Sequence, residues 1–139
     1  MLLPEKSHRR NPTLLDASRS LLVIIDVQEN FAKAMADFDP LAERIALLAK
    51  AAARIGVPAL VTEQYRKGLG PTASPILESI PEGTPVIEKL AFSACDVPEW
   101  TVAARDSGVW WTAFGSSCFA TFSPAVVMPA TASTATAIM

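Results

Sequence analysis

The sequence is poor in cysteine and histidine, and this scarcity limits the chemistry that it can support. Its two cysteines, Cys95 and Cys118, are too few for the disulfide framework of a secreted protein. We therefore expect a reducing, cytoplasmic environment in which each is a possible free thiol. The single histidine, His8, lies in a polar N-terminal stretch, which disfavours Ser–His catalysis and a histidine-rich metal site.

The sequence also lacks a basic excess, an export signal and, over residues 107–139, any charged residue. The formal net charge of -2 leaves no basic excess to neutralise phosphates, so neither nucleic acid nor a membrane surface is expected as a partner. An apolar run typical of an export signal is lacking near the N-terminus, and residues 1–17 are expected to form a surface arm. Residues 107–139 contain no charged side chain, so the composition changes abruptly at Ser107.

The remaining residues, 18–106, have the pattern of one α/β domain. Residues 21–26 form an unbroken apolar run that ends in an acid, which predicts a central strand buried on both faces. Residues 40–55 then follow a helical period, with Asp39 as the expected N-cap and Gly56 as the stop. Residues 57–62 form a second apolar run, so a βαβ unit with a parallel sheet is expected.

Four further elements are expected downstream. After the last of these four elements the apolar residues follow neither a helical nor a strand period, because prolines interrupt the chain and an Ala/Thr/Ser-rich run comes last. The expected elements are a short helix over 75–80, a strand over 85–89, a helix within 96–106 that packs through Trp100, Val102 and Ala103, and a strand over 108–114.

Two ionisable side chains stand where such folds bind ligands, outside the carboxyl ends of the strands. Asp26 follows the first strand and Lys89 ends the third, with the loop of Glu63, Gln64 and Tyr65 between them in sequence. A carboxylate beside a lysine keeps both charged, and it could deprotonate a nearby thiol that the lysine then holds as a thiolate. The alternative is a purely structural ion pair.

Three motifs between Ser18 and Asp106 carry a family resemblance. Residues 22–31 resemble the D-x-Q-x-x-F signature of isochorismatase-like hydrolases. Residues 62–72 are similar to the T-E-Q-Y-x-x-G-L-G-P-T loop of the branch that includes the isochorismatase-domain-containing proteins, and residues 89–93 match its K-x-x-F-S. The three motifs occur in the family's order and spacing.

The resemblance implies a three-layer α/β/α fold with a parallel sheet and an Asp–Lys–Cys triad. In that triad the cysteine attacks an amide or similar carbon of a small molecule. Asp26 takes the place of the general base, and Lys89 that of the lysine that supports charged intermediates. Phe31 corresponds to a pocket wall, although core packing is the alternative, and Gln64 and Tyr65 are the other expected substrate-binding residues. Relatives of this kind are commonly homo-oligomers.

The resemblance also bears on metal binding. The nicotinamidase branch of the family binds a metal through a D-x-H motif after the second strand. This chain has Glu63, Gln64 and Tyr65 there, and no glycine-rich phosphate loop follows the first strand. Neither a metal nor another cofactor is expected.

The family's nucleophile lies in a G-x-E-x-x-x-C segment, and here the match ends. Gly115 stands near the position of that glycine, but Cys118 comes three residues early and Thr121 occupies the cysteine position. Residues 107–139 are therefore expected to be a divergent segment in which the closing strands and helices are missing or altered. A frameshifted or recombined gene end would explain this segment.

Three functions follow as hypotheses. The first is a cysteine hydrolase of small amides that uses Asp26, Lys89 and Cys118. The second is a catalytically inactive, truncated domain that only associates with other chains through an uncovered sheet edge. The third, a phosphoacceptor receiver, is disfavoured because Val27 replaces the second acid after the first strand and Lys89 stands where an aspartate is required.

Overall fold

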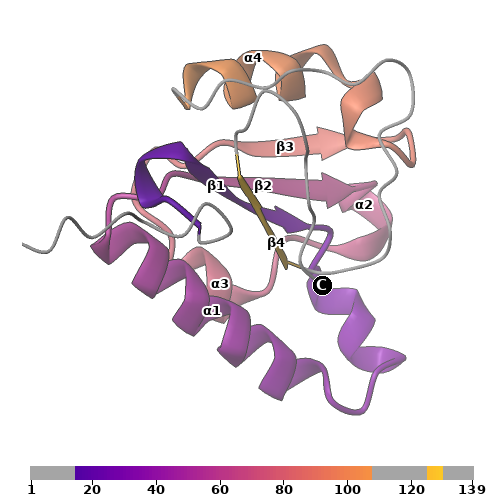
Figure 1. Ribbon diagram of the computed structural model, residues 1–139. Coiled ribbons are helices and arrows are strands. Elements are labelled where there is room, and N and C mark those ends of the chain that lie inside the picture. Colours follow the sequence, from indigo (N-terminus) through magenta and orange to yellow (C-terminus); the bar gives the residue numbers. More distant parts are fainter. Residues whose placement is uncertain (1–14, 108–124, 130–139) are drawn as a thin grey trace, which may run out of the picture.

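The computed structural model describes residues 15–107 and 125–129, which build one four-stranded sheet in the order β3-β2-β1-β4 (Figure 1). Strand β1 (Ser20–Ile25) runs parallel to β2 (Ala59–Gln64), and β2 runs parallel to β3 (Val86–Lys89). The predicted parallel α/β sheet is confirmed for these three strands. Strand β4 (Ala125–Pro129) pairs antiparallel with β1 and was not predicted.

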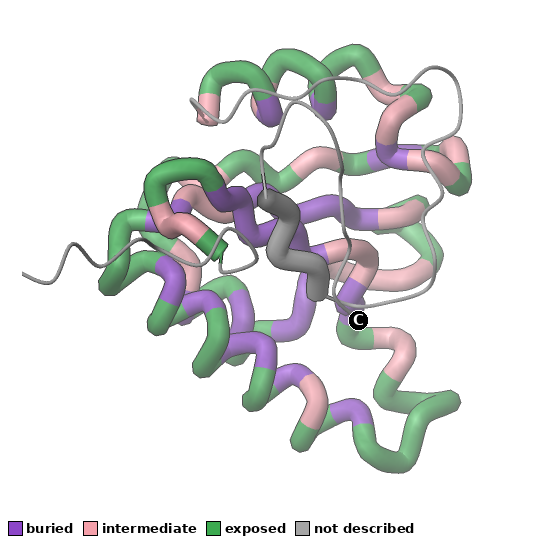
Figure 2. Tube along the Cα trace, in the orientation of Figure 1, coloured by how far each residue is buried: buried purple, intermediate pink, exposed green. Residues whose placement is uncertain are grey.

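Strand β1 is covered on both faces, as its unbroken apolar run requires. Leu22 and Ile24 are fully buried in the core cluster that includes helix α1. Leu21 and Val23 point to the opposite face and pack in a second cluster. Figure 2 shows this buried stretch at the centre of the molecule. The alternation of side chains along one strand thus feeds two separate cores.

Helix α1 (Phe38–Arg54) covers one face of the sheet with a stripe of small and branched side chains. It begins earlier than predicted, because Phe38 is buried against the core in the first turn and Asp37, not Asp39, occupies the N-cap. Pro40 is accommodated in that first turn, where its missing N–H has no helical partner. The predicted stop is confirmed, since Gly56 has a φ of +76°.

The opposite face is covered by η3 (Ala94–Asp96) and α4 (Pro98–Asp106), so the three-layer α/β/α arrangement is confirmed (Figure 1). Trp100 and Ala104, four residues apart on α4, are buried in the second core cluster. The prediction that Val102 also packs inward is wrong. Two residues beyond Trp100 a helix has turned by more than half a circle, and Val102 is 55% exposed. Ala103 is partly buried against the cluster, as predicted.

The short elements lie mainly in the connections. A 3₁₀ turn precedes β1, another follows it, and a single helical turn interrupts the connection after β2 that was predicted to be a loop. These three elements are η1 (Ala17–Arg19), η2 (Glu29–Lys33) and α2 (Arg66–Leu69). The short helix predicted over 75–80 is present as α3 (Ser74–Leu77). The strand predicted over 108–114 and most of the N-terminal arm lie outside the described residues. Within the described part of the chain, no helix has both the length and the apolar character to span a membrane.

Trp100 should be the main attachment of α4 to the sheet. Trp100→Ala removes a buried aromatic side chain, and large-to-small changes of this kind cost about 3–5 kcal/mol. Val102→Ala on the same helix is the matched control and should cost about 0.5 kcal/mol or less, because its side chain is mostly exposed. Urea denaturation monitored by circular dichroism measures both values, and similar losses for the two variants would contradict this packing.

Candidate active site

The structure brings Asp26 and Lys89 together at the carboxyl ends of β1 and β3. The Lys89 Nζ donates a hydrogen bond of 2.6 Å to the Asp26 Oδ2, and the two side chains form an ion pair. The lysine side chain is 1% exposed, whereas that of Asp26 is 23% exposed. The pair therefore presents a partly accessible carboxylate to the outside and a buried ammonium behind it.

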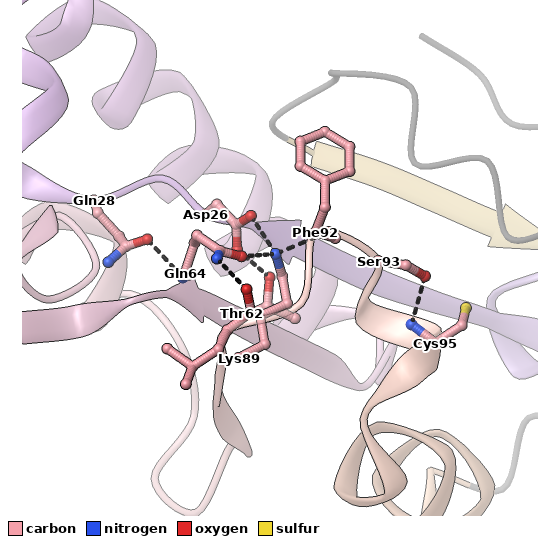
Figure 3. A network of polar contacts seen from close by, with 9 residues as sticks. Asp26, Gln28, Thr62, Gln64, Lys89, Phe92, Ser93 and Cys95 are labelled. Atoms are coloured by element: carbon pink, nitrogen blue, oxygen red, sulfur yellow. Dashed lines mark hydrogen bonds and ion pairs between the residues drawn. The ribbon is translucent and has the colours of Figure 1, made fainter. Parts of the chain in front are cut away.

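The Lys89 ammonium has an acceptor for each of its three N–H bonds (Figure 3). Besides Asp26, it donates to the Gln64 Oε1 at 2.7 Å and to the backbone carbonyl of Phe92 at 3.2 Å. These acceptors come from the segments that follow β1, end β2 and follow β3. The position of the charge is thus fixed by three separate parts of the chain.

Asp26 is held by Thr62 as well as by Lys89. The Thr62 hydroxyl donates to the Asp26 Oδ1 at 2.7 Å, and the Asp26 N–H donates to the Thr62 carbonyl at 3.0 Å. Asp26 adopts a φ of 55° in the left-handed region, which Asp tolerates better than most residues. Tyr65, just after β2, is the other described non-glycine residue with positive φ, at 40°. Backbone strain of this kind concentrates at functional sites.

A buried glutamine joins the ends of β1 and β2. Gln28 is fully buried, and its Oε1 accepts a 2.7 Å hydrogen bond from the backbone N–H of Gln64. Its Nε2 donates to the carbonyl of Gly70. The Gln64 side chain in turn donates from Nε2 to the Leu90 carbonyl at 2.9 Å. One network therefore runs from Gln28 through Gln64 to Lys89.

A buried carboxylate, that of Glu63, holds the connection that contains α2 through hydrogen bonds and an ion pair. Glu63 is 1% exposed, and its Oε1 accepts from the N–H and the hydroxyl of Thr72 at 2.7 and 2.9 Å. Its Oε2 lies 3.2 Å from the guanidinium of Arg66. Gly70 has a φ of 80° and a ψ of -178°, a region essentially restricted to glycine. These contacts give the connection one defined conformation.

The other predicted site residues have different placements. Phe31 is partly buried against the core cluster on the α1 side, consistent with the packing alternative. Tyr65 is 50% exposed where α2 begins. Cys118 lies outside the described residues. Cys95 is disulfide-bonded, so the expectation of a free thiol is wrong for this residue.

Sequence reasoning missed three contributors to the network. Gln28 belongs to the D-x-Q motif, and that spacing was the available signal for it. Thr62 and Phe92 also belong to quoted motifs, as the first residue of 62–72 and the aromatic residue of 89–93. Residue type gives no sign that the hydroxyl of Thr62 binds Asp26 or that the backbone carbonyl of Phe92 binds Lys89. Within the described residues, no group of three or more His, Cys, Asp or Glu side chains is arranged to hold a metal ion.

A model of the isochorismatase domain matches residues 20–112, more than half of the chain. The chain belongs to the isochorismatase family. It is 38% identical over 74 residues to mouse isochorismatase domain-containing protein 2A, a match that covers 53% of this chain and 34% of that protein. It is 34% identical over 83 residues to isochorismatase family protein 1A of Dictyostelium discoideum, covering 58% and 40%. The chain thus spans well under half the length of these relatives.

Solved structures support the same fold for this family member. The chain is similar to the MAR1 ribonuclease of Caenorhabditis elegans, with a TM-score of 0.56 and 35% identity over 61% of this chain and 43% of that one. The Escherichia coli YcaC product, described as an octameric hydrolase of unknown specificity, superposes with a TM-score of 0.54 at 19% identity. That match covers 71% of this chain and 50% of that one, and it shows the fold alone.

The Asp26–Lys89 pair should be energetically coupled. Removing one partner of a buried charge pair leaves the other uncompensated, so Asp26→Asn and Lys89→Met should each destabilise the chain, whereas the double variant should lose less than their sum. We expect a coupling free energy of about 1–3 kcal/mol from a double-mutant cycle in urea. Strictly additive losses would contradict the pairing, and Lys50→Met, on the exposed face of α1, is the control for loss of a lysine.

Proposed function

We propose that the chain is a hydrolase of small amides or related small molecules that acts through Asp26, Lys89 and Cys118. Membership of the isochorismatase family suggests a hydrolase. The observation that carries the finer proposal is the 2.6 Å contact between the partly exposed Asp26 carboxylate and the buried Lys89 ammonium, at the carboxyl ends of parallel strands.

The roles follow from what each group has available. Asp26 accepts one described side-chain hydrogen bond on each oxygen, so lone pairs remain to take the proton from a thiol. The thiolate of Cys118 then attacks the carbonyl carbon, the proton passes from Asp26 to the leaving amine, and water hydrolyses the resulting thioester. The three N–H bonds of Lys89 are already used, so its support for anionic species is electrostatic.

Substrate contacts belong to the same proposal. Tyr65 is half exposed beside Gln64, and both follow or end β2 next to the charged pair. Phe31, the last residue of the first motif, is the third proposed substrate-binding residue and lies at the margin of the core. We also propose that the chain associates with copies of itself into homo-oligomers. Light scattering at the concentration of the assay measures the mass of these assemblies.

Amide hydrolysis should depend on all three proposed catalytic residues. Under reducing conditions, a panel of small aliphatic and aromatic amides should be turned over with release of ammonia, and iodoacetamide should abolish the activity. Cys118→Ala should remove it, and Asp26→Asn should lower kcat by about 10²–10⁴-fold, the usual contribution of a general base. Lys89→Met should lower kcat as well.

Under the same reducing conditions, Cys95→Ala is the matched control for thiol chemistry, because it removes the other cysteine, together with the disulfide that this cysteine forms, and leaves Cys118 in place. Its activity should equal that of the unmodified chain and stay sensitive to iodoacetamide. Activity that survives in Cys118→Ala would rule out the nucleophile. No turnover of any amide by a folded chain would support the alternative of an inactive domain that only associates with other chains.

A further inference from the structure

The Gln64 side chain is oriented by partners at both ends of its amide. Its Nε2 donates to the Leu90 carbonyl at 2.9 Å, and its Oε1 accepts from the Lys89 Nζ at 2.7 Å. Because an ammonium can only donate, the amide oxygen has to face it. The contact to Leu90 therefore selects the one orientation of the amide in which it serves the lysine.

Gln28 controls the same contact one step further away. Its fully buried side chain cannot reach a ligand in solvent, yet it accepts from the backbone N–H of Gln64 at 2.7 Å and donates to the Gly70 carbonyl. It thus sets the position of the backbone from which the Gln64 side chain extends. A buried amide with partners for both of its groups is a rigid spacer.

We propose that Gln28 and Gln64 are positioning residues that act in series to hold the Lys89 ammonium against Asp26 (Figure 3). Loss of the Gln64 carbonyl leaves one N–H of a buried ammonium without its acceptor. The ammonium then gains from turning toward water, and its contact with Asp26 loosens. The consequence for catalysis rests on the proposed function, but the placement of Lys89 can be measured without any activity.

The competing explanation is that these glutamines merely fasten the connection after β2. Asn30 offers a matched control, because its Nδ2 donates to the Gly68 carbonyl at 2.8 Å in that same connection. It makes no described contact with Gln64 or Lys89. A purely structural role predicts the same effect from Asn30→Ala as from Gln28→Leu.

The test is the rate at which formaldehyde and cyanoborohydride methylate each lysine of the full chain, read by mass spectrometry of peptides. In the unmodified chain Lys89 should react far more slowly than the exposed Lys50, since its side chain is 1% exposed. Gln64→Leu should raise the methylation rate of Lys89 by about tenfold. In that variant the ammonium can turn toward water without breaking a hydrogen bond to Gln64. Gln64→Glu keeps an acceptor for the ammonium and should leave the rate low.

Gln28→Leu should also raise the methylation rate of Lys89. Because the two glutamines act in series, the double variant Gln28→Leu/Gln64→Leu should react no faster than the faster of the two single variants. Asn30→Ala should leave it unchanged. Circular dichroism reports whether each variant is folded, and the exposed Lys50 shows that the reagent acts equally in each sample. If Gln28→Leu does not fold, the Gln64→Leu and Gln64→Glu pair decides the proposal. Equal Lys89 rates in those two variants, or an Asn30→Ala effect as large as that of Gln28→Leu, would overturn it.

Failure of this proposal and failure of the proposed function are distinguishable. Methylation of Lys89 needs neither a substrate nor Cys118, so a chain without amide turnover can still show the expected pattern of rates. Conversely, amide turnover that depends on Cys118 can persist in a chain whose Lys89 reactivity ignores both glutamines.

Discussion

The burial of one ammonium group is the constraint on which this edge of the molecule depends. A buried charge is tolerated only when it is paired and its hydrogen bonds are satisfied. Lys89 meets that requirement with acceptors from Asp26, Gln64 and Phe92. Because these groups follow or end three parallel strands, the strand register that builds the core also assembles the charged pair.

The strands and the neighbourhood of the pair could be predicted from sequence for the same physical reason. Unbroken apolar runs predict strands buried on both faces, and parallel strands bring their carboxyl ends to one edge. Asp26 and Lys89 were thus expected at the same edge of the sheet, but β2 lies between their two strands, so only the structure shows that they touch. The predicted start of α1 was too late, because Asp39 and Pro40 match the preferences of a helix N-terminus, whereas the burial of Phe38 is visible only in the structure.

What could not be predicted depends on tertiary contacts. The left-handed backbone of Tyr65 has no signal in residue type, and at Asp26 the residue type only permits that conformation. The D-x-Q spacing marks Gln28, but only the structure shows that both ends of its amide form hydrogen bonds. The antiparallel pairing of β4 with β1 joins segments about a hundred residues apart, which local patterns cannot specify.

The described part of this isochorismatase-family chain brings Asp26 and Lys89 into contact, and we propose that they form a catalytic centre with Cys118 as its third member. A crystal structure of the reduced chain, with its reactive thiol trapped by acrylamide, tests that claim most directly. We expect an adduct on Cys118 whose sulfur lies within roughly 4–6 Å of both the Asp26 carboxylate and the Lys89 ammonium, the range over which charges perturb a thiol. A separation of roughly 10 Å or more, at which exposed charges are largely screened, would contradict it.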